Sequence, residues 1–299
     1  MTVYPNVKLN LGLRVMGKRP DGYHELQTVF LPCYQWSDCL EIVPAPSFEV
    51  EVSGPEYTGW DPSEDLTARA WRLLRADFGI PPVKIALEKR SPVGAGLGGG
   101  SADGAFCLAA LNELFSLGLT LPRLASYAAQ LGSDCAFFVY NFPMYACGRG
   151  EILEPIHLPL EDYHFEVAVP SRVHVSTKEA YGGLKLDGDR PSAGASCESD
   201  GPGLRELLLS TPVEKWRDVV LNDFEPSVFA AHPEIAALKE DFYRRGALFS
   251  SMSGSGSSVF GIWKEGPRNF KTGSSNGSSR RRRLPGCPKI NSKTTGNVL

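Results

Sequence analysis

The chain has 299 residues, of which 42% are hydrophobic and 22% charged, which excludes a disordered chain and suits two domains or one large one. No apolar run reaches the ~18–20 residues of a membrane-spanning helix, and residues 1–15 lack the pattern of a signal peptide. The seven cysteines are scattered without a C-x-x-C pair, which predicts neither a zinc site nor a disulfide framework and favours a reducing cytoplasm.

The net charge of −3 hides an asymmetry between the body of the chain and its end. Residues 264–299 hold nine Lys/Arg and one Glu, a net +8, which leaves 22 basic and 33 acidic residues, a net −11, in residues 1–263. Residues 264–299 are rich in Ser and Gly and lack apolar periodicity, so we expect them to be disordered or foreign to the fold. The acidic body predicts no nucleic-acid partner, and we expect no membrane partner.

The first predicted strand covers residues 3–16, and its apolar residues share one face: Val7, Leu9, Leu11, Leu13 and Val15. Lys8 and Asn10 lie on the opposite face, where they could line a site; the alternative for Lys8 is an ordinary solvated lysine. A Pro-Asp-Gly turn follows and presents Tyr23 and His24 either to a ligand or merely to solvent. Strands predicted over 26–31, 40–43 and 48–52 complete what we expect to be a β-meander.

The remainder of the pattern is α+β, with no internal repeat. We expect helices over 64–78, 102–117, 123–131, 213–220 and 234–245, and strands over 83–87, 165–169, 247–252 and 258–263. A polar loop is predicted over 187–203, and a turn at 132–134 leads into an apolar run that ends at residue 140.

A glycine-rich loop, SPVGAGLGGGSADGA (residues 91–105), joins a predicted strand to a predicted helix. Glycines let backbone N–H groups approach one anion, and the helix adds its positive N-terminal end, so this unit predicts a phosphate site. The loop lacks the Lys of a Walker A motif. Gly94, Gly96 and Gly99 satisfy G-x-G-x-x-G, but a dinucleotide fold requires a second strand where a helix is predicted. A merely flexible loop is the remaining alternative.

Two further features accompany this loop. SMSGSGSSVF (residues 251–260) is either a second backbone clamp near the same phosphates or an ordinary hairpin or linker. Asp134 precedes the apolar run, where it either caps a turn or accepts a hydroxyl proton, as a kinase requires.

Together these segments resemble the GHMP kinases. The motifs PNVKLNLGL (5–13), RPDGYHELQTVF (19–30), SPVGAGLGGGSADGA (91–105), LGSDCAFF (131–138) and MSGSGSSVF (252–260) occur in the order typical of that family. DGYHEL is typical of members whose small-molecule substrate carries a cytidine diphosphate group. The resemblance implies a ribosomal-protein-S5-like domain over 1–160, a ferredoxin-like domain over 161–263 and an active site in the cleft between them. It also implies ATP as phosphoryl donor, with Mg²⁺, a cytoplasmic enzyme of non-mevalonate isoprenoid synthesis, and a monomer or homodimer.

The resemblance also implies residue roles. Asp134 matches the family's catalytic base and Lys8 its partner, and the loop around the triphosphate matches Pro92, Val93, Gly94, Ala95, Gly96, Leu97, Gly98, Gly99, Gly100, Ser101 and Ala102. Positions that hold the substrate match Asn10, Tyr23, His24, Gly254, Ser255 and Gly256, and Tyr181 is the candidate for the aromatic residue that stacks on cytosine. No residue is assigned to a metal. The family loop often has a second Ser where this chain has Ala102.

Two other functions stay open. One is a GHMP kinase for another small alcohol, such as mevalonate or homoserine, against which DGYHEL argues. The other is RNA binding through Arg280–Arg283, because adjacent arginines neutralise phosphates. The net charge of the body argues against RNA binding.

Overall fold

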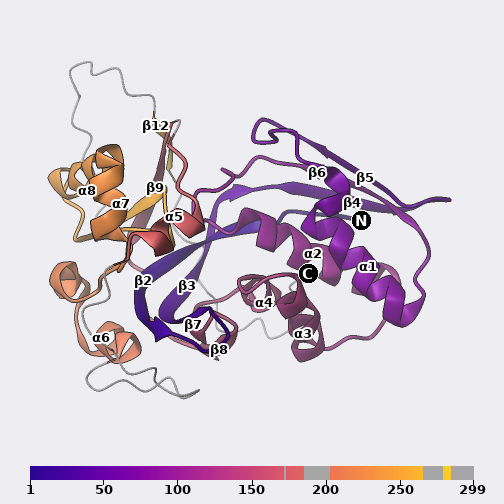
Figure 1. Cartoon of the computed structure of the whole chain (residues 1–299), viewed down its shortest axis with the longest axis horizontal. Coiled ribbons are helices and arrows are strands. Elements are labelled where there is room, and N and C mark those ends of the chain that lie inside the picture. The colour runs from indigo at the N-terminus through magenta and orange to yellow at the C-terminus, as the bar shows by residue number, and fades with distance from the viewer. Residues whose placement is uncertain (172, 185–202, 265–278, 284–299) are drawn as a thin grey trace.

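The computed structural model describes residues 1–171, 173–184, 203–264 and 279–283. These residues form three four-stranded sheets. Helices α1 to α4 lie at one end of the molecule and α7 and α8 at the other, with the long strands β2 and β3 running between them (Figure 1). The elements are therefore α+β, as the sequence predicts.

The first sheet has the order β1-β4-β6-β5, formed by Thr2–Val3, Cys39–Pro44, Val83–Glu88 and Glu49–Ser53. Strand β5 runs parallel to β6, whereas the other pairs are antiparallel. The expected β-meander is therefore wrong in this sheet. Parallel neighbours need a crossover, and helix α1 (Leu66–Phe78) provides it between β5 and β6.

The second sheet has the order β2-β3-β7-β8, formed by Asn6–Lys18, His24–Ser37, Met144–Gly148 and Ile152–Pro155. The β2–β3 register shifts between Leu11 and Leu13, where Gly12 has φ +68°. This irregularity divides the predicted apolar face. Residues before it, such as Leu9, belong to one hydrophobic core, and Leu13 and Val15 after it belong to another.

The N-terminal half of the chain also contains four helices: α1, α2 (Gly99–Leu114), α3 (Leu121–Leu131) and α4 (Cys135–Tyr140). A 3₁₀ turn, η1 (Pro62–Glu64), precedes α1. Asp65 begins α1 by accepting a hydrogen bond from the Thr67 N–H, and Gly79 ends it in a left-handed conformation. Helix α2 begins at Gly99, earlier than the predicted residue 102, so the end of the glycine-rich loop is already helical.

The third sheet has the order β10-β11-β9-β12, formed by Phe249–Met252, Val259–Trp263, His164–Pro170 and Ser279–Arg283. Helices α5 (Thr177–Gly182), α6 (Leu204–Ser210), α7 (Glu225–Ala231) and α8 (Pro233–Arg244) accompany it, with the 3₁₀ turn η2 (Val213–Asp218) where an α-helix was predicted. The predicted polar loop over 187–203 lies outside the described residues except at 203.

Strand β12 corrects part of the expectation for residues 264–299. Its backbone pairs antiparallel with β9, with Arg281 opposite Ala168. Strand pairing uses backbone N–H and C=O groups, which an exposed edge offers to any extended segment. The amino-acid composition of residues 264–299 describes their side chains only, so it does not predict a strand held by backbone pairing.

A hydrophobic core lies between the second and third sheets. It joins Leu9 and Tyr145 to Phe249 and Phe260, and thus crosses the predicted domain boundary at 160/161. Among the described residues, Cys39, Cys107 and Cys135 are free thiols, whereas Cys147 in β7 is disulfide-bonded. Cysteine spacing along the chain does not report which sulfurs the fold brings together, so the bond at Cys147 was not expected. None of the described helices is long and apolar enough to span a membrane.

The irregularity at Gly12 makes a testable prediction. A Cβ at Gly12 would lie 2.7 Å from Leu204 Cδ1, whereas a Cβ at Gly22, with φ +86°, meets nothing within 4 Å. We expect Gly22→Ala to cost about 1–2 kcal/mol from φ alone. Gly12→Ala should cost about 1–3 kcal/mol more from overpacking against Leu204. Urea unfolding of both variants measures the difference, and equal losses would contradict this account of the bend.

Candidate active site

Lys8 and Asp134 meet in the structure although they are far apart in the chain. Lys8 is 3% exposed, and its Nζ lies 3.3 Å from Asp134 Oδ2. Asp134 precedes α4, but its side chain makes no capping hydrogen bond to that helix, and it keeps 30% exposure. The alternatives of a solvated lysine and of a turn-capping aspartate are therefore wrong. A buried ammonium is directed at a carboxylate that solvent and ligands can reach.

Two more partners hold the Lys8 ammonium. It donates hydrogen bonds to Asn10 Oδ1 and, at 3.1 Å, to the Gly96 carbonyl. The Asn10 amide in turn donates to Thr28 Oγ1 at 3.1 Å. Alternate residues of a strand share a face, so β2 places Asn10 beside Lys8. Its observed contacts are thus with the lysine, unlike the expected place at the cytidine end; direct contact of Asn10 with a substrate stays a prediction.

The glycine-rich loop alternates between residues that anchor it and residues that stay open. Ala95 and Leu97 are buried in the hydrophobic core. Gly94, Gly96 and Gly98 between them have φ of +68°, +75° and +71°. Pro92 and Ala102 are also buried, whereas Val93 and Gly100 are exposed and Ser101 is half-buried. This alternation holds the loop down while its backbone remains accessible.

Helix α2 begins directly after these glycines. Gly98 stands at its N-cap and provides no side-chain cap. The first N–H groups of a helix have no partner within it, and together with the helix dipole they form an anion site. The loop and the start of α2 therefore have the geometry that binds phosphate groups.

The second glycine-rich loop connects β10 to β11 as a hairpin and also packs on the first loop. Ser253 Oγ accepts a hydrogen bond from the Asn10 N–H at 3.0 Å and donates to the Gly96 carbonyl at 3.2 Å. A Cβ on Gly96 would lie 2.1 Å from the Ser253 carbonyl oxygen, so only glycine allows this approach. Gly254 would place its Cβ 3.1 Å from Asn10 Oδ1. Ser255 Oγ and Thr177 Oγ1 are 3.5 Å apart, which links the hairpin to α5.

Aromatic side chains gather at the start of β3 and on α5. The rings of His24 and Tyr181 stack with centroids 4.6 Å apart, and Tyr181 packs its edge against Phe224. Tyr23 is 58% exposed, with the Arg149 guanidinium 4.9 Å from its ring centroid. Burial, assisted by the charge of Lys18, lowers the pKa of His24, and burial raises the pKa of Tyr181 to about 12. At neutral pH both rings are therefore uncharged.

Sequence reasoning missed three residues of this arrangement. Ser253 lies in the motif MSGSGSSVF, but sequence reasoning singled out only the three residues that follow it, Gly254, Ser255 and Gly256. Thr28 lies on β3, and only the β2–β3 pairing brings it to Asn10. Arg149 stands between two glycines, which predicts a turn. A turn signal does not indicate that Arg149 lies beside Tyr23.

Comparison with known proteins adds independent findings. The family model described as "GHMP kinases N terminal domain" matches residues 65–142, and "GHMP kinases C terminal" matches residues 196–270. A 4-diphosphocytidyl-2-C-methyl-D-erythritol kinase of Bacteroides thetaiotaomicron is 44% identical over 268 residues, covering 88% of this chain and 92% of its own. The same enzyme of Azobacteroides pseudotrichonymphae is 40% identical, covering 91% and 97%.

Solved structures agree with these relatives. A crystal structure of 4-(cytidine 5'-diphospho)-2C-methyl-D-erythritol kinase has a TM-score of 0.67 and 32% identity, covering 88% of this chain and 90% of that chain. A homoserine kinase from Cytophaga hutchinsonii has a TM-score of 0.61 at 18% identity, covering 87% and 85%, which is a likeness of fold.

Substitutions at two glycines of the loop distinguish a side chain that presses on Lys8 from one that occupies the space expected for a ligand. A Cβ on Gly98 would lie 3.0 Å from Lys8 Cε, so a side chain at this position would press on the lysine. A Cβ on Gly100 meets nothing within 4 Å. We expect Gly98→Ala to lower kcat by displacing Lys8.

Gly100→Ala should instead stabilise α2 by about 0.5–1 kcal/mol while weakening the binding of an ATP analogue. The added methyl group would extend into the space where phosphate is expected. Calorimetric titration and thermal unfolding measure both effects. Unchanged affinity of Gly100→Ala would show that no phosphate approaches the start of α2.

Proposed function

The chain belongs to the GHMP kinase family, and we propose that it transfers the γ-phosphoryl group of ATP to the C2 hydroxyl of 4-diphosphocytidyl-2-C-methyl-D-erythritol. The products are the 2-phosphate and ADP, in the non-mevalonate route to isoprenoid precursors. The observation that carries the proposal is the Lys8–Asp134 pair next to the first glycine-rich loop, residues 92–102, here called the phosphate loop. The chain that holds this pair is 44% identical to a kinase named for this substrate. The cytoplasmic location expected from the sequence remains part of the proposal.

The phosphate loop and α2 bind the triphosphate of ATP through backbone N–H groups. Hard oxygen donors are the ligands that Mg²⁺ takes, usually few from protein and the rest from phosphates and water. The Ser101 hydroxyl, half-buried in the first turn of α2, is such a donor beside the loop, and it would hold a Mg²⁺ that accompanies ATP. When bound, the ion neutralises charge on the phosphate oxygens.

Asp134 acts on the proton of the acceptor alcohol. An alcohol is too weak an acid to ionise at neutral pH, and a positioned carboxylate that accepts its proton contributes about 10²–10⁴-fold to the rate. Lys8 brings a positive charge to the same place, where negative charge develops on the attacking oxygen. Its bonds to Asn10 and Gly96 fix the ammonium in position, so little reorganisation is needed during the reaction.

The cytidine end is assigned to the aromatic group around Tyr23. Because His24 and Tyr181 already stack on each other at 4.6 Å, a base does not fit between them as they stand. Tyr23 has an exposed ring with Arg149 against it, so we assign cytosine to stacking on the open part of Tyr23. His24, which is uncharged, offers one nitrogen as donor and one as acceptor to the base. Tyr181 stacks on one face of the His24 imidazole and holds the ring in place.

The remaining alternatives are tested by direct comparison. ADP release is followed with ATP, Mg²⁺ and each of three alcohols: the diphosphocytidyl substrate, mevalonate and homoserine. Turnover of mevalonate or homoserine without turnover of the diphosphocytidyl alcohol would overturn the proposal. RNA binding through residues 280–283 should weaken steeply with salt and disappear when residues 264–299 are deleted.

Asp134 and Lys8 should act as a unit in the chemical step. Asp134→Asn keeps the shape of the side chain but removes its basicity, so kcat should fall by about 10²–10⁴-fold with little change in either binding constant. Lys8→Ala should also lower kcat, and the double variant should lose less than the product of the two losses. The exposed Asp162 provides a matched control, since Asp162→Asn should leave kcat unchanged. Retention of more than about a tenth of the parent kcat by Asp134→Asn would refute the assignment of the base.

The lowered pKa of His24 predicts a pH dependence for the cytidine end. The pKa of His24 lies below the ordinary histidine value of about 6.5. The imidazole therefore stays mostly neutral from alkaline pH down to about pH 6.5 and becomes protonated only at lower pH. The KM for the diphosphocytidyl substrate should therefore be constant from pH 8 to about 6.5 and rise only at lower pH. The KM for ATP should not follow this rise, and His24→Gln should raise the first KM and abolish its pH dependence. A rise that begins above pH 7 would contradict the assignment.

A further inference from the structure

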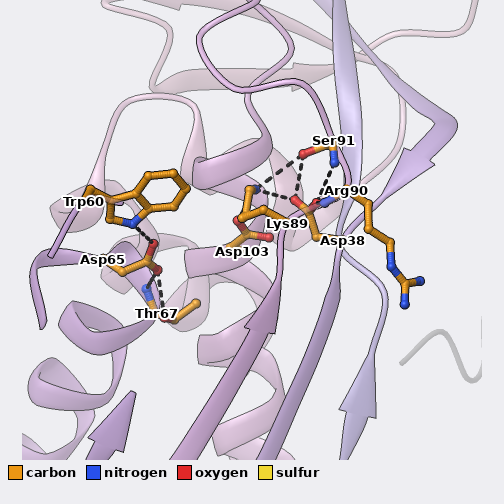
Figure 2. Close-up of polar contacts among 8 residues, drawn as sticks. All are labelled: Asp38, Trp60, Asp65, Thr67, Lys89, Arg90, Ser91 and Asp103. Carbon is orange, nitrogen blue, oxygen red and sulfur yellow. Dashed lines mark hydrogen bonds and ion pairs between the residues drawn. The ribbon is translucent and has the colours of Figure 1, made fainter. Parts of the chain in front are cut away.

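A buried polar cluster lies behind the phosphate loop and takes no part in the chemistry described above. It consists of Asp38, Lys89, Ser91 and Asp103, here called the Lys89 cluster, and Figure 2 shows the Lys89 ammonium directed at the other three residues. Lys89 donates to Asp38 Oδ2, to Asp103 Oδ2 at 2.6 Å and to Ser91 Oγ at 3.4 Å. Lys89 is 2% exposed and Asp103 1%, so solvent contributes little to either charge.

The position of the cluster in the chain is what connects it to the phosphate loop. Ser91 directly precedes residues 92–102, and Asp103 directly follows them, in the first turns of α2. Asp38 joins the same group from the turn between β3 and β4. It accepts hydrogen bonds from the N–H and, at 2.7 Å, the hydroxyl of Ser91. Both ends of the loop therefore contact the Lys89 ammonium, and the Ser91 end is also bound to the Asp38 carboxylate.

The start of α2 is packed directly against this cluster. A Cβ on Gly99 would lie 2.5 Å from Ser91 Oγ and 3.4 Å from Lys89 Nζ, so the helix terminus approaches as closely as a glycine allows. The N–H groups that face a phosphate belong to the same turn. A shift of the cluster would move those groups.

The charges of the cluster are paired within it. The Lys89 ammonium contacts the carboxyl groups of Asp38 and Asp103, and burial raises the pKa of Asp103 well above its ordinary value, against the lowering effect of Lys89. Asp103 Oδ1 has no hydrogen-bond partner among the described residues, so the side chain is held through Oδ2 and Lys89.

We propose that the Lys89 cluster is the positioning element of the phosphate loop: by binding Ser91 and Asp103 it fixes the two ends of the loop before ATP arrives. Preorganisation raises affinity because the loop does not have to be ordered on binding. Lys89 and Asp103 are thus positioning residues for the nucleotide, not catalytic ones. The inference rests on the proposed use of ATP.

The test compares two changes at Asp103 with a matched control. Asp103→Ala removes the loop's attachment to Lys89 and should weaken the binding of a non-hydrolysable ATP analogue about tenfold. Asp103→Asn keeps an oxygen that accepts from the ammonium and should restore affinity to within about threefold of the parent. The KM for the alcohol should stay within about twofold for both variants.

The control is Glu166→Ala in β9, which breaks another buried ion pair, the one between Glu166 Oε1 and Arg245 Nη1 at 2.8 Å. It should lower the Tm as Asp103→Ala does, but leave the affinity for the analogue unchanged. If Asp103→Ala does not fold, Ser91→Ala makes a smaller change in the cluster and should weaken the analogue about threefold.

Two results would overturn the inference. One is that Asp103→Ala and Ser91→Ala bind the analogue as tightly as the parent; the other is that the Glu166→Ala control weakens it to the same extent. If the parent chain fails to bind the analogue, the proposed function falls, and the inference with it. Tight binding by the parent together with unchanged variants overturns the inference alone.

Discussion

The close approach of three backbone segments at Gly96 is the constraint on which the rest of the site depends. Strand β2, the phosphate loop and the β10–β11 hairpin meet there, with the missing Cβ of Gly96 only 2.1 Å from the Ser253 carbonyl oxygen. The Gly96 carbonyl accepts from both Lys8 and Ser253. Any residue with a side chain would separate these segments and move the ammonium that faces Asp134. The position of Lys8 is therefore determined by both halves of the chain.

Two buried lysines flank the phosphate loop, and their surroundings separate their roles. Burying an unpaired charge is costly, so each must have partners. Lys8 is bonded to neutral oxygens and to a carboxylate that keeps 30% exposure, which leaves its charge available to a ligand. Lys89 is enclosed by Asp38 and Asp103, which are nearly or fully buried, so its charge is used within the protein. The Lys8 ammonium thus faces a partly exposed carboxylate, whereas the Lys89 ammonium is enclosed within the protein.

The sequence revealed most of what depends on local pattern. Alternation in β2 correctly placed Lys8 and Asn10 on one face, and glycine spacing correctly predicted a glycine-rich loop directly before a helix. What it did not reveal depends on contacts between distant segments. Nothing in the spacing of Asp38, Lys89 and Asp103 indicates that they meet, because the pairing of β4 with β6 brings Asp38 to Lys89 and the packing of α2 adds Asp103. The parallel pairing of β5 and the strand at residues 279–283 were missed for the same reason, since backbone pairing leaves little trace in composition.

The hydrophobic core between the second and third sheets has a consequence for folding. Leu9 and Tyr145 of the first half pack with Phe249 and Phe260 of the second, so much of the apolar surface of each half is covered only by the other. A fragment that ended near residue 160 would expose this surface to water. Each half has further core residues of its own, but this shared core couples the two, so we expect the described body of the chain to unfold as one cooperative unit. Partial opening, and with it proteolysis and aggregation, is thereby suppressed until the whole structure is lost.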